Sequence, residues 1–555
     1  MPTITLNRKV LDALIGKKLS PEELKDRIAM IGTDLESLDD KEVVVEVFPN
    51  RPDMLSEQGF GRALRSFLGL SPGLHEYPVK KSGYKVVVDS SVTMRPYTAC
   101  AIVKNLTFTD ERIKEIMQVQ EKLATTHGRN RKKSAYGIYP LAHITFPITY
   151  IAKDPDKIKF KPLGFDQLLA ASEVLLVHPK AKEYNHLTVG WKKYPFFIDA
   201  KDNVMCMLPF TNSQDTGKVD INTREVFIEC SGIDLANVSV ALNILVTMLA
   251  DMGGEIYSLD VMYGNKKITT PNLTPLSMNF DIAYANKILG LDLKQTDAKK
   301  YLEMMGYSVK GKDVLVPAYR ADILHPRDLV EDIAIAYGYE HIPEEIPVIA
   351  TIAQEDPFDV FKQKIGNLLV GYGMYEVSNF HLIDTAAQTT QMQVPSAVLE
   401  ILDPVSIDYN SLRSWILPCL LQTLRQNKQY EFPQKFFEVG VIFKKDVTKY
   451  ALADEAVRLG VVVCHQKASF TEARQILDYI LRMLEIEYTV VESELGCFLP
   501  GRVGRVIVKD ADASIKVAYI GEIHPQVLQN FGLEMPVAAV ELNLTELWKV
   551  VGKRL

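Results

Sequence analysis

The sequence predicts an α+β protein built from several domains. The chain has 555 residues, more than one hydrophobic core supports, so we expect three to five domains. Hydrophobic residues make up 47% of the chain and charged residues 24%, as in ordinary globular proteins. Segments with the two-residue period of strands alternate with segments that have the period of helices. Together these observations predict a chain in which helices and strands are mixed.

Composition also excludes several classes of protein. The longest apolar stretches, such as residues 241–250, are far shorter than the roughly 20 residues that span a bilayer, and the N-terminus has no apolar signal region, so we expect no membrane partner. The net charge of −7 argues against a free nucleic-acid-binding module as the main function. Six scattered cysteines without zinc spacing indicate small core residues in a reduced, cytoplasmic protein. They are Cys100, Cys206, Cys230, Cys419, Cys464 and Cys497.

Residues 1–88 predict an N-terminal α/β domain followed by a linker. Ser20 is a candidate N-cap with Pro21 at the first helical position, and Ser56 is a candidate N-cap for the helix that follows. Residues 71–88 are punctuated by Pro and Gly and are interpreted as the linker. Residues 50–53 are interpreted as a structural turn in which Arg51 pairs locally. Gly59, Gly61 and Arg62 fit no phosphate-loop spacing.

Three further domains are expected. Residues 89–268 predict a mixed α/β domain with strands within 98–108, 143–152, 194–200, 203–210 and 224–232, and helices within 110–128 and 237–254. Residues 269–346 predict two short helices, each closed by a glycine, and a strand within 313–320. Residues 347–555 predict an α+β domain with strands within 375–383, 434–443, 458–465, 501–509 and 517–523, and an apolar helix within 416–427.

Four carboxylates lie close together in the third domain. Pro326 suits the first turn of a helix that runs to about Ala336. Its spacing places three of them on one helix face, and Asp322 precedes the helix and can fold back over that face. Converging hard oxygens suit Mg²⁺, although acidic residues near a helix N-terminus are also stabilised by the helix dipole alone. The candidate metal ligands are Asp322, Asp328, Glu331 and Asp332.

The segment VPAYRADILHPRDLVEDIAIAYGYEHIP resembles the signature of the phenylalanyl-tRNA synthetase β subunit. FPNRPDMLSEQGFGRAL, MLPFTNSQDTGKVDINTREVFIECSGID, SLRSWILPCLLQTLRQN and KFFEVGVIF resemble further parts of that family in the same order. The chain is similar to the short archaeal type, because it has no room for the extra bacterial domains. The resemblance implies a winged-helix-like domain at 269–346, with the four carboxylates above at the family's magnesium-ligand positions.

The resemblance also implies a class II synthetase-like domain at 347–555 that lacks the catalytic motifs. KFFEVGVIF keeps Glu438 and Gly440 without a nearby ATP-binding arginine, and the GRVGRV stretch at residues 501–506 has too few glycines for a nucleotide motif. ATP and phenylalanine are therefore expected on an α subunit, in an α₂β₂ phenylalanine–tRNA ligase that charges tRNA(Phe). The apolar helix around Ile416–Leu424 is either a contact for that subunit or an internal core helix.

The domain at 89–268 resembles an editing domain that hydrolyses Tyr-tRNA(Phe). A hydrophobic pocket rejects an added hydroxyl poorly, so a second hydrolytic site is a physical remedy. Glu229 or Asp234 is expected to recognise the tyrosine hydroxyl or to orient water, although such residues are also ordinary turn formers. The candidate catalytic residues are Asn212, Ser213, Thr216, Thr223, Glu229 and Asp234. The alternative is a non-catalytic scaffold and tRNA-positioning subunit with an inactive editing site.

The densest basic cluster lies in the same domain at residues 127–133. Its side chains either contact phosphates of the tRNA acceptor end or form a solvated loop. They are Arg129, Arg131, Lys132 and Lys133.

Overall fold

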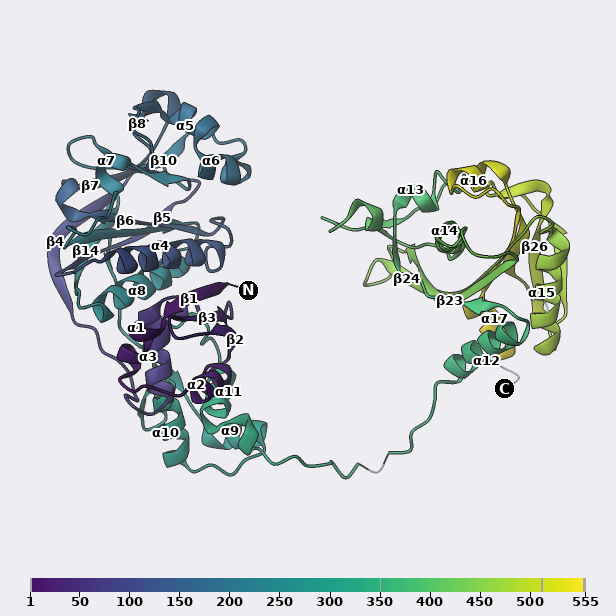
Figure 1. Ribbon diagram of the computed structural model, residues 1–555, viewed down its shortest axis with the longest axis horizontal. Helices are drawn as coiled ribbons and strands as arrows, with labels where there is room; N and C mark the ends of the chain where they lie inside the picture. The colour runs from purple at the N-terminus through teal and green to yellow at the C-terminus, as the bar shows by residue number, and fades with distance from the viewer. Residues whose placement is uncertain (1, 350, 511–512, 553–555) are drawn as a thin grey trace. The chain divides into compact units, whose positions relative to one another are not determined.

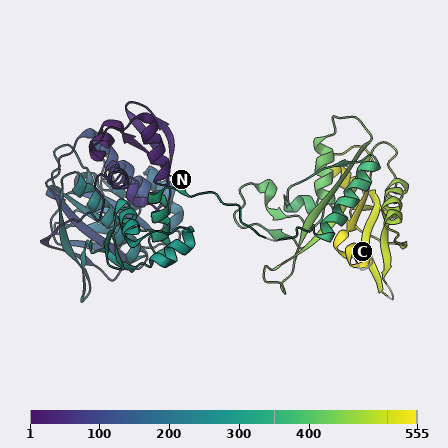
Figure 2. The same ribbon diagram turned by 90° about the horizontal axis from the view of Figure 1, so that it is seen from below.

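The computed structural model describes residues 2–349, 351–510 and 513–552, and the chain divides into two compact units (Figure 1). Unit 1 spans Met1–Ile346 and unit 2 spans Pro347–Leu555, so the division falls at the domain start expected at residue 347. Residues 342–349 and 351–356, between the last helix of unit 1 and the first of unit 2, contain no helix or strand (Figure 2). No helix among the described residues is long and apolar enough to cross a membrane.

Unit 1 begins with a small antiparallel sheet in the order β1-β3-β2, together with three α-helices and a short 3-10 helix. Both predicted N-caps are confirmed: Ser20 Oγ accepts the Glu23 N–H at 3.1 Å, and Ser56 Oγ accepts the Gly59 N–H at 2.9 Å. The strands are β1 (Thr3–Asn7), β2 (Thr33–Leu38) and β3 (Glu42–Val47), and the helices are α1 (Arg8–Ile15), α2 (Pro21–Met30), η1 (Pro52–Met54) and α3 (Glu57–Phe67).

A ten-stranded mixed sheet forms the largest part of unit 1, in the order β12-β11-β10-β7-β4-β14-β5-β13-β6, with β15 paired to β14. Helices α4 (Asp110–Thr125) and α8 (Leu235–Asp251) cover one face (Figure 1). The strands are β4 (Val79–Val88), β5 (Tyr97–Lys104), β6 (Ser134–Pro140), β7 (Ile148–Lys153), β10 (Tyr194–Ile198), β11 (Val204–Met207), β12 (Thr211–Asn212), β13 (Val226–Gly232), β14 (Glu255–Tyr263) and β15 (Lys266–Thr270). Short elements complete it: η2 (Leu141–His143), η3 (Pro155–Lys157), β8 (Lys159–Phe160), β9 (Leu169–Ala170), α5 (Ala171–Val177), α6 (Pro179–Tyr184), η4 (Asn185–Thr188) and α7 (Gln214–Gly217).

The prediction of a linker over residues 71–88 is wrong for the second half of that range. Residues Val79–Val88 form β4, which lies between β14 and β7 and is parallel to both. The mixed α/β domain therefore begins near residue 79 rather than 89. The Pro and Gly signals that suggested a linker lie before the strand and at Gly83, whose φ of +77° is the left-handed conformation that glycine tolerates.

The last part of unit 1 packs three helices against a small sheet in the order β16-β18-β17. The predicted glycine closures are confirmed: Gly290 caps the first helix at φ +69°, and Gly306 follows the second at φ +86°. A winged-helix relationship stays a prediction. The elements are β16 (Leu276–Asn279), α9 (Ile282–Leu289), α10 (Gln295–Met304), β17 (Ser308–Lys310), β18 (Asp313–Val316), α11 (Pro326–Tyr337) and η5 (Tyr339–His341).

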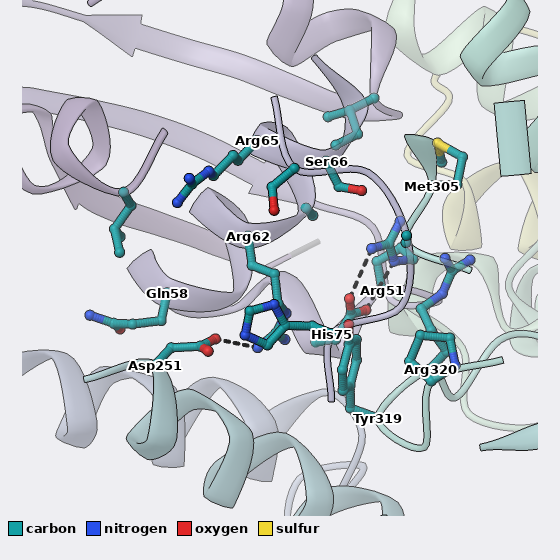
Figure 3. A pocket seen from close by; sticks show the side chains of 18 of the residues that line it. Arg51, Gln58, Arg62, Arg65, Ser66, His75, Asp251, Met305, Tyr319 and Arg320 are labelled. Carbon is teal, nitrogen blue, oxygen red and sulfur yellow. Dashed lines mark hydrogen bonds and ion pairs between the residues drawn. The ribbon is translucent and has the colours of Figure 1, made fainter. Parts of the chain in front are cut away.

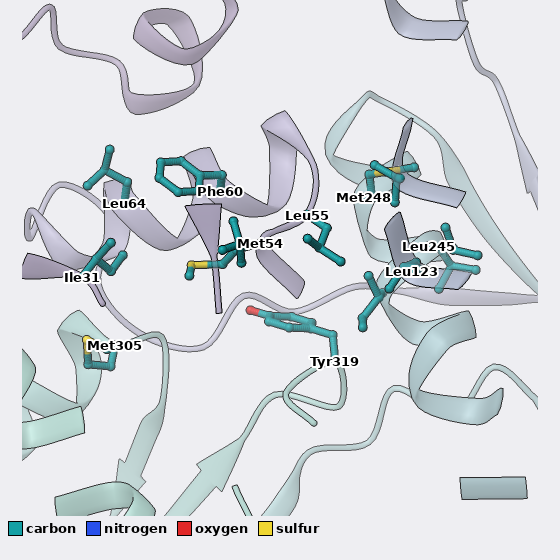
Figure 4. Packing of buried hydrophobic residues seen from close by; sticks show 14 of the residues in the cluster. Ile31, Met54, Leu55, Phe60, Leu64, Leu123, Leu245, Met248, Met305 and Tyr319 are labelled. Carbon is teal, nitrogen blue, oxygen red and sulfur yellow. The ribbon is translucent and has the colours of Figure 1, made fainter. Parts of the chain in front are cut away.

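These parts of unit 1 share one hydrophobic core. Figure 4 shows Tyr319, which precedes the acidic segment (residues 322–332), beside Met54 and Leu55 of the N-terminal part, with Met248 of α8 farther along the same cluster. Leu55 and Met248 are at most 1% exposed. Because side chains from distant segments fill the same core, the acidic segment is held against the N-terminal domain rather than on a separate module.

Unit 2 is built on a seven-stranded sheet in the order β19-β23-β24-β28-β27-β26-β25, antiparallel except for the β19–β23 pair. Helices α12, α15 and α17 pack on one face, and α14 and α16 pack on part of the other. The main elements are α12 (Pro357–Gly371), α14 (Leu417–Gln426), β23 (Gln434–Lys445), β24 (Ala453–Cys464), α15 (Phe470–Met483), β25 (Tyr488–Glu492), β26 (Phe498–Asp510), β27 (Ala513–Ile523), α16 (Pro525–Asn530), β28 (Val537–Asn543) and α17 (Leu544–Val551).

Strand pairing and burial decide two expectations for unit 2. The strand expected over residues 375–383 is wrong, because only its ends pair, as β19 (Tyr375–Glu376) and β20 (Leu382–Ile383). The apolar helix α14 is internal: Ile416, Leu420 and Leu421 are 0% exposed, so the core interpretation holds and the subunit-contact interpretation does not. The remaining short elements are α13 (Thr385–Gln388), β21 (Leu399–Glu400), η6 (Ile407–Tyr409) and β22 (Ser411–Leu412).

Candidate functional site

The candidate site of the large sheet lies on the face opposite α4 and α8. The side chains of strand β13 alternate between the two faces of the sheet. Val226, Ile228 and Cys230 pack in the core that contains α4 and α8. Glu229 and Ser231 point to the opposite face. The sheet curls until its two ends meet, because α7, which follows β12, packs against β6 at the opposite end. Glu229 is 0% exposed within this curled interior.

A hydrogen-bonded chain crosses that junction. The Tyr139 hydroxyl of β6 lies 3.2 Å from Asn212 Oδ1 of β12 and 3.3 Å from Glu229 Oε1 of β13. A phenol has one hydrogen to donate, so a second contact at this oxygen requires a donor. The Tyr139 hydrogen is donated to one of the two oxygens, and both contacts are hydrogen bonds at once only when Glu229 carries a proton. The structure thus brings together two predicted residues, Asn212 and Glu229, through a tyrosine that the sequence analysis missed.

Burial raises the pKa of Glu229 to about 8, and the nearby side chains of Ser231, Tyr139 and Arg95 oppose this shift. Three buried polar atoms around it have no hydrogen-bond partner within the described parts of the chain: Glu229 Oε2, Ser231 Oγ and Arg95 Nε. Arg95 is held beside them, since its Nη2 donates to the Ser231 carbonyl at 3.0 Å. Unsatisfied buried polar atoms are rare in folded proteins, so this enclosed group is suited to the polar end of a ligand.

The other predicted residues make local hydrogen bonds. Thr216 is buried and donates to the Val204 carbonyl at 3.2 Å, and Thr223 donates to Asp220 at 3.1 Å within a turn. Asp234 is exposed and caps α8 by accepting the Ala236 N–H at 2.9 Å. Ser213 is 2% exposed and follows Asn212 at the start of α7. Their catalytic roles stay predictions.

Part of the basic cluster at residues 127–133 makes hydrogen bonds and an ion pair within the chain. Arg131 Nη1 donates to the Pro209 and Phe210 carbonyls, and its Nη2 pairs with Glu121 at 3.0 Å. Residues 129–131 all have positive φ, and their N–H groups donate to carbonyls at the C-terminal end of α4. Arg129 and Lys132 are exposed and remain candidates for phosphate contacts.

The pKa of Glu229 gives a stability prediction. Between about pH 4.5 and 8 the folded chain keeps a proton that the unfolded chain has released, so its stabilising contribution is complete below pH 4.5 and is lost as the pH rises to about 8. Relative to a Glu229→Gln variant, the wild type is expected to lose on the order of a few kcal/mol across this window. Urea unfolding at several pH values measures the difference, and a constant difference would contradict it.

The acidic segment forms the predicted helix, α11, but its carboxylates do not gather at one point. Asp322 makes two hydrogen bonds with Arg320, both at 2.8 Å, and the buried Asp332 accepts from Arg320 at 2.9 Å and from the Tyr307 hydroxyl. Asp328 accepts the N–H groups of Leu324 and His325, both at 2.7 Å, which caps the helix. Glu331 is exposed.

This arrangement does not fit the convergent magnesium site expected from the sequence. A guanidinium already neutralises two of the four carboxylates, where a metal cation would compete with it. Among the described residues, the sole group of three ligand atoms within 4.8 Å of one another is Asp34, Glu36 and Glu46, in the N-terminal sheet. The four predicted ligands do line a common cavity of about 610 Å³. Bound magnesium stays a prediction, and no step below depends on it.

A second cavity, of about 350 Å³, is lined by residues that include Arg51, Arg62 and Arg320 (Figure 3). There Arg51 pairs with Asp53 through bonds of 2.9 and 2.8 Å, which confirms the local pairing predicted for the turn. Arg62 pairs with Asp251 of α8 and lies 4.1 Å from the centre of the Tyr319 ring. A Cβ on Gly59 would lie 1.9 Å from the Asp53 carbonyl, so this glycine permits close packing rather than phosphate binding.

Asp328 is expected to stabilise the fold without metal. Replacing Asp328 by alanine removes the helix cap and should lower the free energy of unfolding by about 1 kcal/mol. Glu331→Ala is the matched control, since it changes an exposed carboxylate on the same helix and should shift stability by less than about 0.5 kcal/mol. Thermal unfolding in EDTA and in magnesium measures both. A larger loss for Glu331→Ala in magnesium would instead support a metal at this face.

In unit 2, the segment that keeps Glu438 and Gly440 does have an arginine beside it. Arg413 Nη1 pairs with Glu438 Oε1 at 2.5 Å, and both side chains are at most 3% exposed. A Cβ on Gly440 would lie 2.2 Å from Arg413 Nη2, so the glycine makes room for the guanidinium. The sequence analysis missed this arginine because it lies between β22 and α14, outside the KFFEVGVIF stretch that contains Glu438 and Gly440. Its guanidinium is buried in the ion pair with Glu438.

Two family models match the chain. The phenylalanyl tRNA synthetase beta chain CLM domain matches residues 342–544, and the tRNA synthetase B5 domain matches residues 278–339, which contain the acidic segment. A phenylalanine–tRNA ligase beta subunit of Thermococcus sibiricus is 40% identical over 560 residues, covering 99% of both chains. The chain belongs to the phenylalanine–tRNA ligase β-subunit family.

Other members of the β-subunit family are similar to the chain over nearly its whole length. The subunit of Pyrococcus abyssi is 39% identical over 99% of this chain, and that of Archaeoglobus fulgidus is 37% identical over 98%. Among solved structures, an N-terminal fragment of the phenylalanyl-tRNA synthetase beta subunit from Pyrococcus horikoshii matches with a TM-score of 0.59 and 38% identity. It covers 61% of this chain and 100% of the fragment. The resemblance to the β-subunit family drawn from the sequence is confirmed.

Proposed function

We propose that this chain is the β subunit of a phenylalanine–tRNA ligase and that it hydrolyses Tyr-tRNA(Phe) at the Glu229 cluster. The observation that carries the editing proposal is the enclosed group of unpartnered polar atoms on Glu229, Ser231 and Arg95. A structural core has no need for three such atoms together, whereas a site that reads a phenol hydroxyl does.

Selectivity follows from the cost of leaving these atoms unpaired. A tyrosyl group entering the curled interior would offer its hydroxyl to the neutral Glu229 and to Arg95. A phenylalanyl group would keep those polar atoms dry and without a partner, which costs about 1–3 kcal/mol per group. Sites built to hydrogen-bond a hydroxyl reject the analogue that lacks it far better than apolar pockets reject an added hydroxyl.

Hydrolysis also needs a polarised ester carbonyl and an oriented water. Asn212 is suited to polarising the carbonyl, because its Oδ1 is engaged by Tyr139 and its amide N–H groups are thereby oriented. Gly217 supports this position, because a Cβ there would lie 2.7 Å from the Asn212 Cβ. Asn212 and Ser213 begin the segment that closes the curled sheet, and they are the residues of this chain that we assign to the ester end.

The test is deacylation of Tyr-tRNA(Phe) by the full chain, with and without an α subunit, and with Phe-tRNA(Phe) as the control substrate. We expect hydrolysis of the tyrosyl ester and little hydrolysis of the phenylalanyl ester. Equal loss of both esters would contradict recognition of the hydroxyl. No hydrolysis with the α subunit present would favour the second candidate, a scaffold and tRNA-positioning subunit whose editing site is inactive.

The proposal includes an α subunit that binds ATP and phenylalanine and joins this chain in an α₂β₂ enzyme acting on tRNA(Phe). A patch of exposed apolar side chains in unit 2 supports such a partner. The patch lies around β20 and η6, where Phe380 is 72% and Ile407 79% exposed and the Phe380 and Tyr409 rings are 5.6 Å apart. It comprises Phe380, Leu382, Leu402, Val405, Ile407 and Tyr409. A cytoplasmic location is also proposed, supported by six buried, unpaired cysteines.

Replacing both Phe380 and Ile407 by serine is expected to weaken binding of the α subunit at least tenfold. Both side chains are exposed in the chain alone, so its own unfolding temperature should change little. The matched control is Val447→Ser, which removes an apolar side chain, 74% exposed, outside the patch. Analytical ultracentrifugation with a titrated α subunit measures the association. Unchanged binding by the double variant would remove this patch from the interface.

A further inference from the structure

A cavity of about 650 Å³ in unit 2 has no part in the proposed editing or subunit contact. It lies on the sheet face that α14 and α16 only partly cover, and its lining includes residues of strands β23, β24, β26, β27 and β28. Arg458 and Glu541, on neighbouring strands, project from this face into its floor. The volume is within the range of small-molecule sites, roughly 300–1,000 Å³.

The lining of this cavity is strongly cationic. It carries five cationic side chains and two carboxylates, an excess of three positive charges. Within the described residues, four of the cations lie farther than 4.0 Å from every carboxylate: Lys444, Lys445, Arg505 and Lys516. The cations are Lys444, Lys445, Arg458, Arg505 and Lys516, and the carboxylates are Glu541 and Glu546.

Both carboxylates are already engaged. Glu541 pairs with Arg458 at 2.6 Å and accepts the N–H groups of Ile416 and Leu417 at the start of α14. Glu546 pairs with Lys549 at 2.7 Å. The other four cations of the cavity make no ion pair within 4.0 Å among the described residues, although the charges of Glu541 and Glu546 still act on Lys444. Burial lowers the pKa of Lys444, and the charge of Arg458 acts in the same direction.

Arg505 is the best-positioned cation. Its guanidinium carbon lies 4.0 Å from the centre of the Tyr519 ring, which holds the guanidinium plane in place. Its Nη2 donates to the Lys516 carbonyl at 3.3 Å, and its Nε has no partner in the described structure. The buried Nε of Arg458 is unpartnered as well. A held guanidinium with open donors is the arrangement that recognises phosphate through paired hydrogen bonds.

We propose that this cavity binds a phosphate ester of nucleotide size, with its phosphates at Arg505, Arg458 and Lys444. The opposite wall is apolar, formed by Trp415, Leu417 and Phe498, and suits the organic part of such a ligand. Arg505 lies in the stretch at 501–506, which lacks the glycines of a nucleotide motif; the sheet geometry supplies the site instead.

The same strand offers a matched control. Arg502 lies three residues before Arg505 in β26, but it is outside the cavity lining and pairs with Glu522 at 3.2 Å on an exposed surface. Arg505→Gln and Arg502→Gln thus remove the same charge from the same strand at two different places. Comparing the two variants separates ligand binding in this cavity from general electrostatic attraction of the ligand to the protein.

The experiment is equilibrium binding of pyrophosphate, and separately of ATP, to the full chain without an α subunit, followed by calorimetry. We expect saturable binding that falls at least tenfold in Arg505→Gln and less than twofold in Arg502→Gln. Thermal unfolding should show that pyrophosphate stabilises the wild type and not Arg505→Gln, while the unliganded proteins unfold alike. No saturable binding at millimolar ligand, or equal binding by the two variants, would overturn the proposal.

A third arm distinguishes the source of the phosphate. A short single-stranded RNA that displaces pyrophosphate more strongly than ATP does, and only when Arg505 is present, would assign the phosphate to an RNA strand. Tighter binding of ATP than of the RNA would assign it to a free nucleotide. Displacement that is independent of Arg505 would place both ligands elsewhere and would count against the cavity.

Discussion

Replacing Arg413 by leucine is expected to lower the free energy of unfolding by about 3–5 kcal/mol, the largest stability effect predicted for unit 2. Arg413 is 1% exposed and neutralises Glu438, which is 3% exposed. Its Nε also donates to the Val441 carbonyl at 2.8 Å. The loss is large because the substitution leaves a carboxylate buried without its counter-charge. Urea unfolding of the full chain measures it.

Two variants test that reason. The double variant Arg413→Leu/Glu438→Leu removes both charges and should recover most of the loss, because a buried pair contributes little net stability over apolar residues of similar size. Arg502→Leu breaks an exposed pair and should cost less than about 1 kcal/mol. If the double variant is as unstable as the single one, packing around Arg413 rather than charge explains the effect.

Replacing Glu229 by leucine is expected to lower kcat/KM for hydrolysis of Tyr-tRNA(Phe) by about 10–100-fold. The variant removes the hydrogen-bonding group that reads the phenol, a loss of about 1–3 kcal/mol, and each 1.4 kcal/mol is tenfold. Because Glu229 is mostly protonated below pH 8, Glu229→Gln should keep much of the activity: an amide also donates and accepts. Hydrolysis of Phe-tRNA(Phe) should stay low in both variants.

The control for this prediction is a second buried glutamate. Burial raises the pKa of Glu115 on α4 to about 8 as well, with the charge of Glu57 adding to the shift. Glu115 accepts the Glu57 N–H at 2.8 Å and has no contact with Tyr139 or Asn212 among the described hydrogen bonds. Glu115→Leu should leave selective hydrolysis unchanged. Equal losses from the two substitutions would show that any buried carboxylate disturbs the domain, and the role of Glu229 would be withdrawn.

Local chemistry made much of the fold predictable. The N-caps Ser20 and Ser56 and the start of α11 at Pro326 depend on residues adjacent in the sequence, and each lies at its expected position. Periodicity likewise identified β5, β7, β10, β11 and β13 of the large sheet in unit 1 and β23, β24, β26 and β27 of the sheet in unit 2. It did not identify β6, β14, β15, β25 or β28. Strand β4 was mistaken for a linker because its Lys, Gly and Ser residues give no clear alternation. It is a strand because two neighbouring strands pair with it.

The candidate site was predictable only in part, because its geometry comes from residues far apart in sequence. Glu229 and Asn212 were identified from motifs, but Tyr139 and Arg95 come from other strands and loops and have no local signal. The acidic segment illustrates the opposite error. Its helix and faces were correct, yet the spacing could not show that Arg320 would occupy the space between Asp322 and Asp332.

The parallel pairing of β4 with β14 has a consequence for synthesis on the ribosome. Residues Val79–Val88 emerge early, but β14, one of the two strands that pair with them, spans Glu255–Tyr263. At about 5–20 residues per second, translation leaves β4 without that neighbour for roughly 10–30 s. The N-terminal domain shares its core with α8, so it too waits for the same part of the chain. Unit 1 therefore completes its large sheet and shared core only after Glu255–Tyr263 have emerged, and chaperones that hold nascent chains can act during this interval.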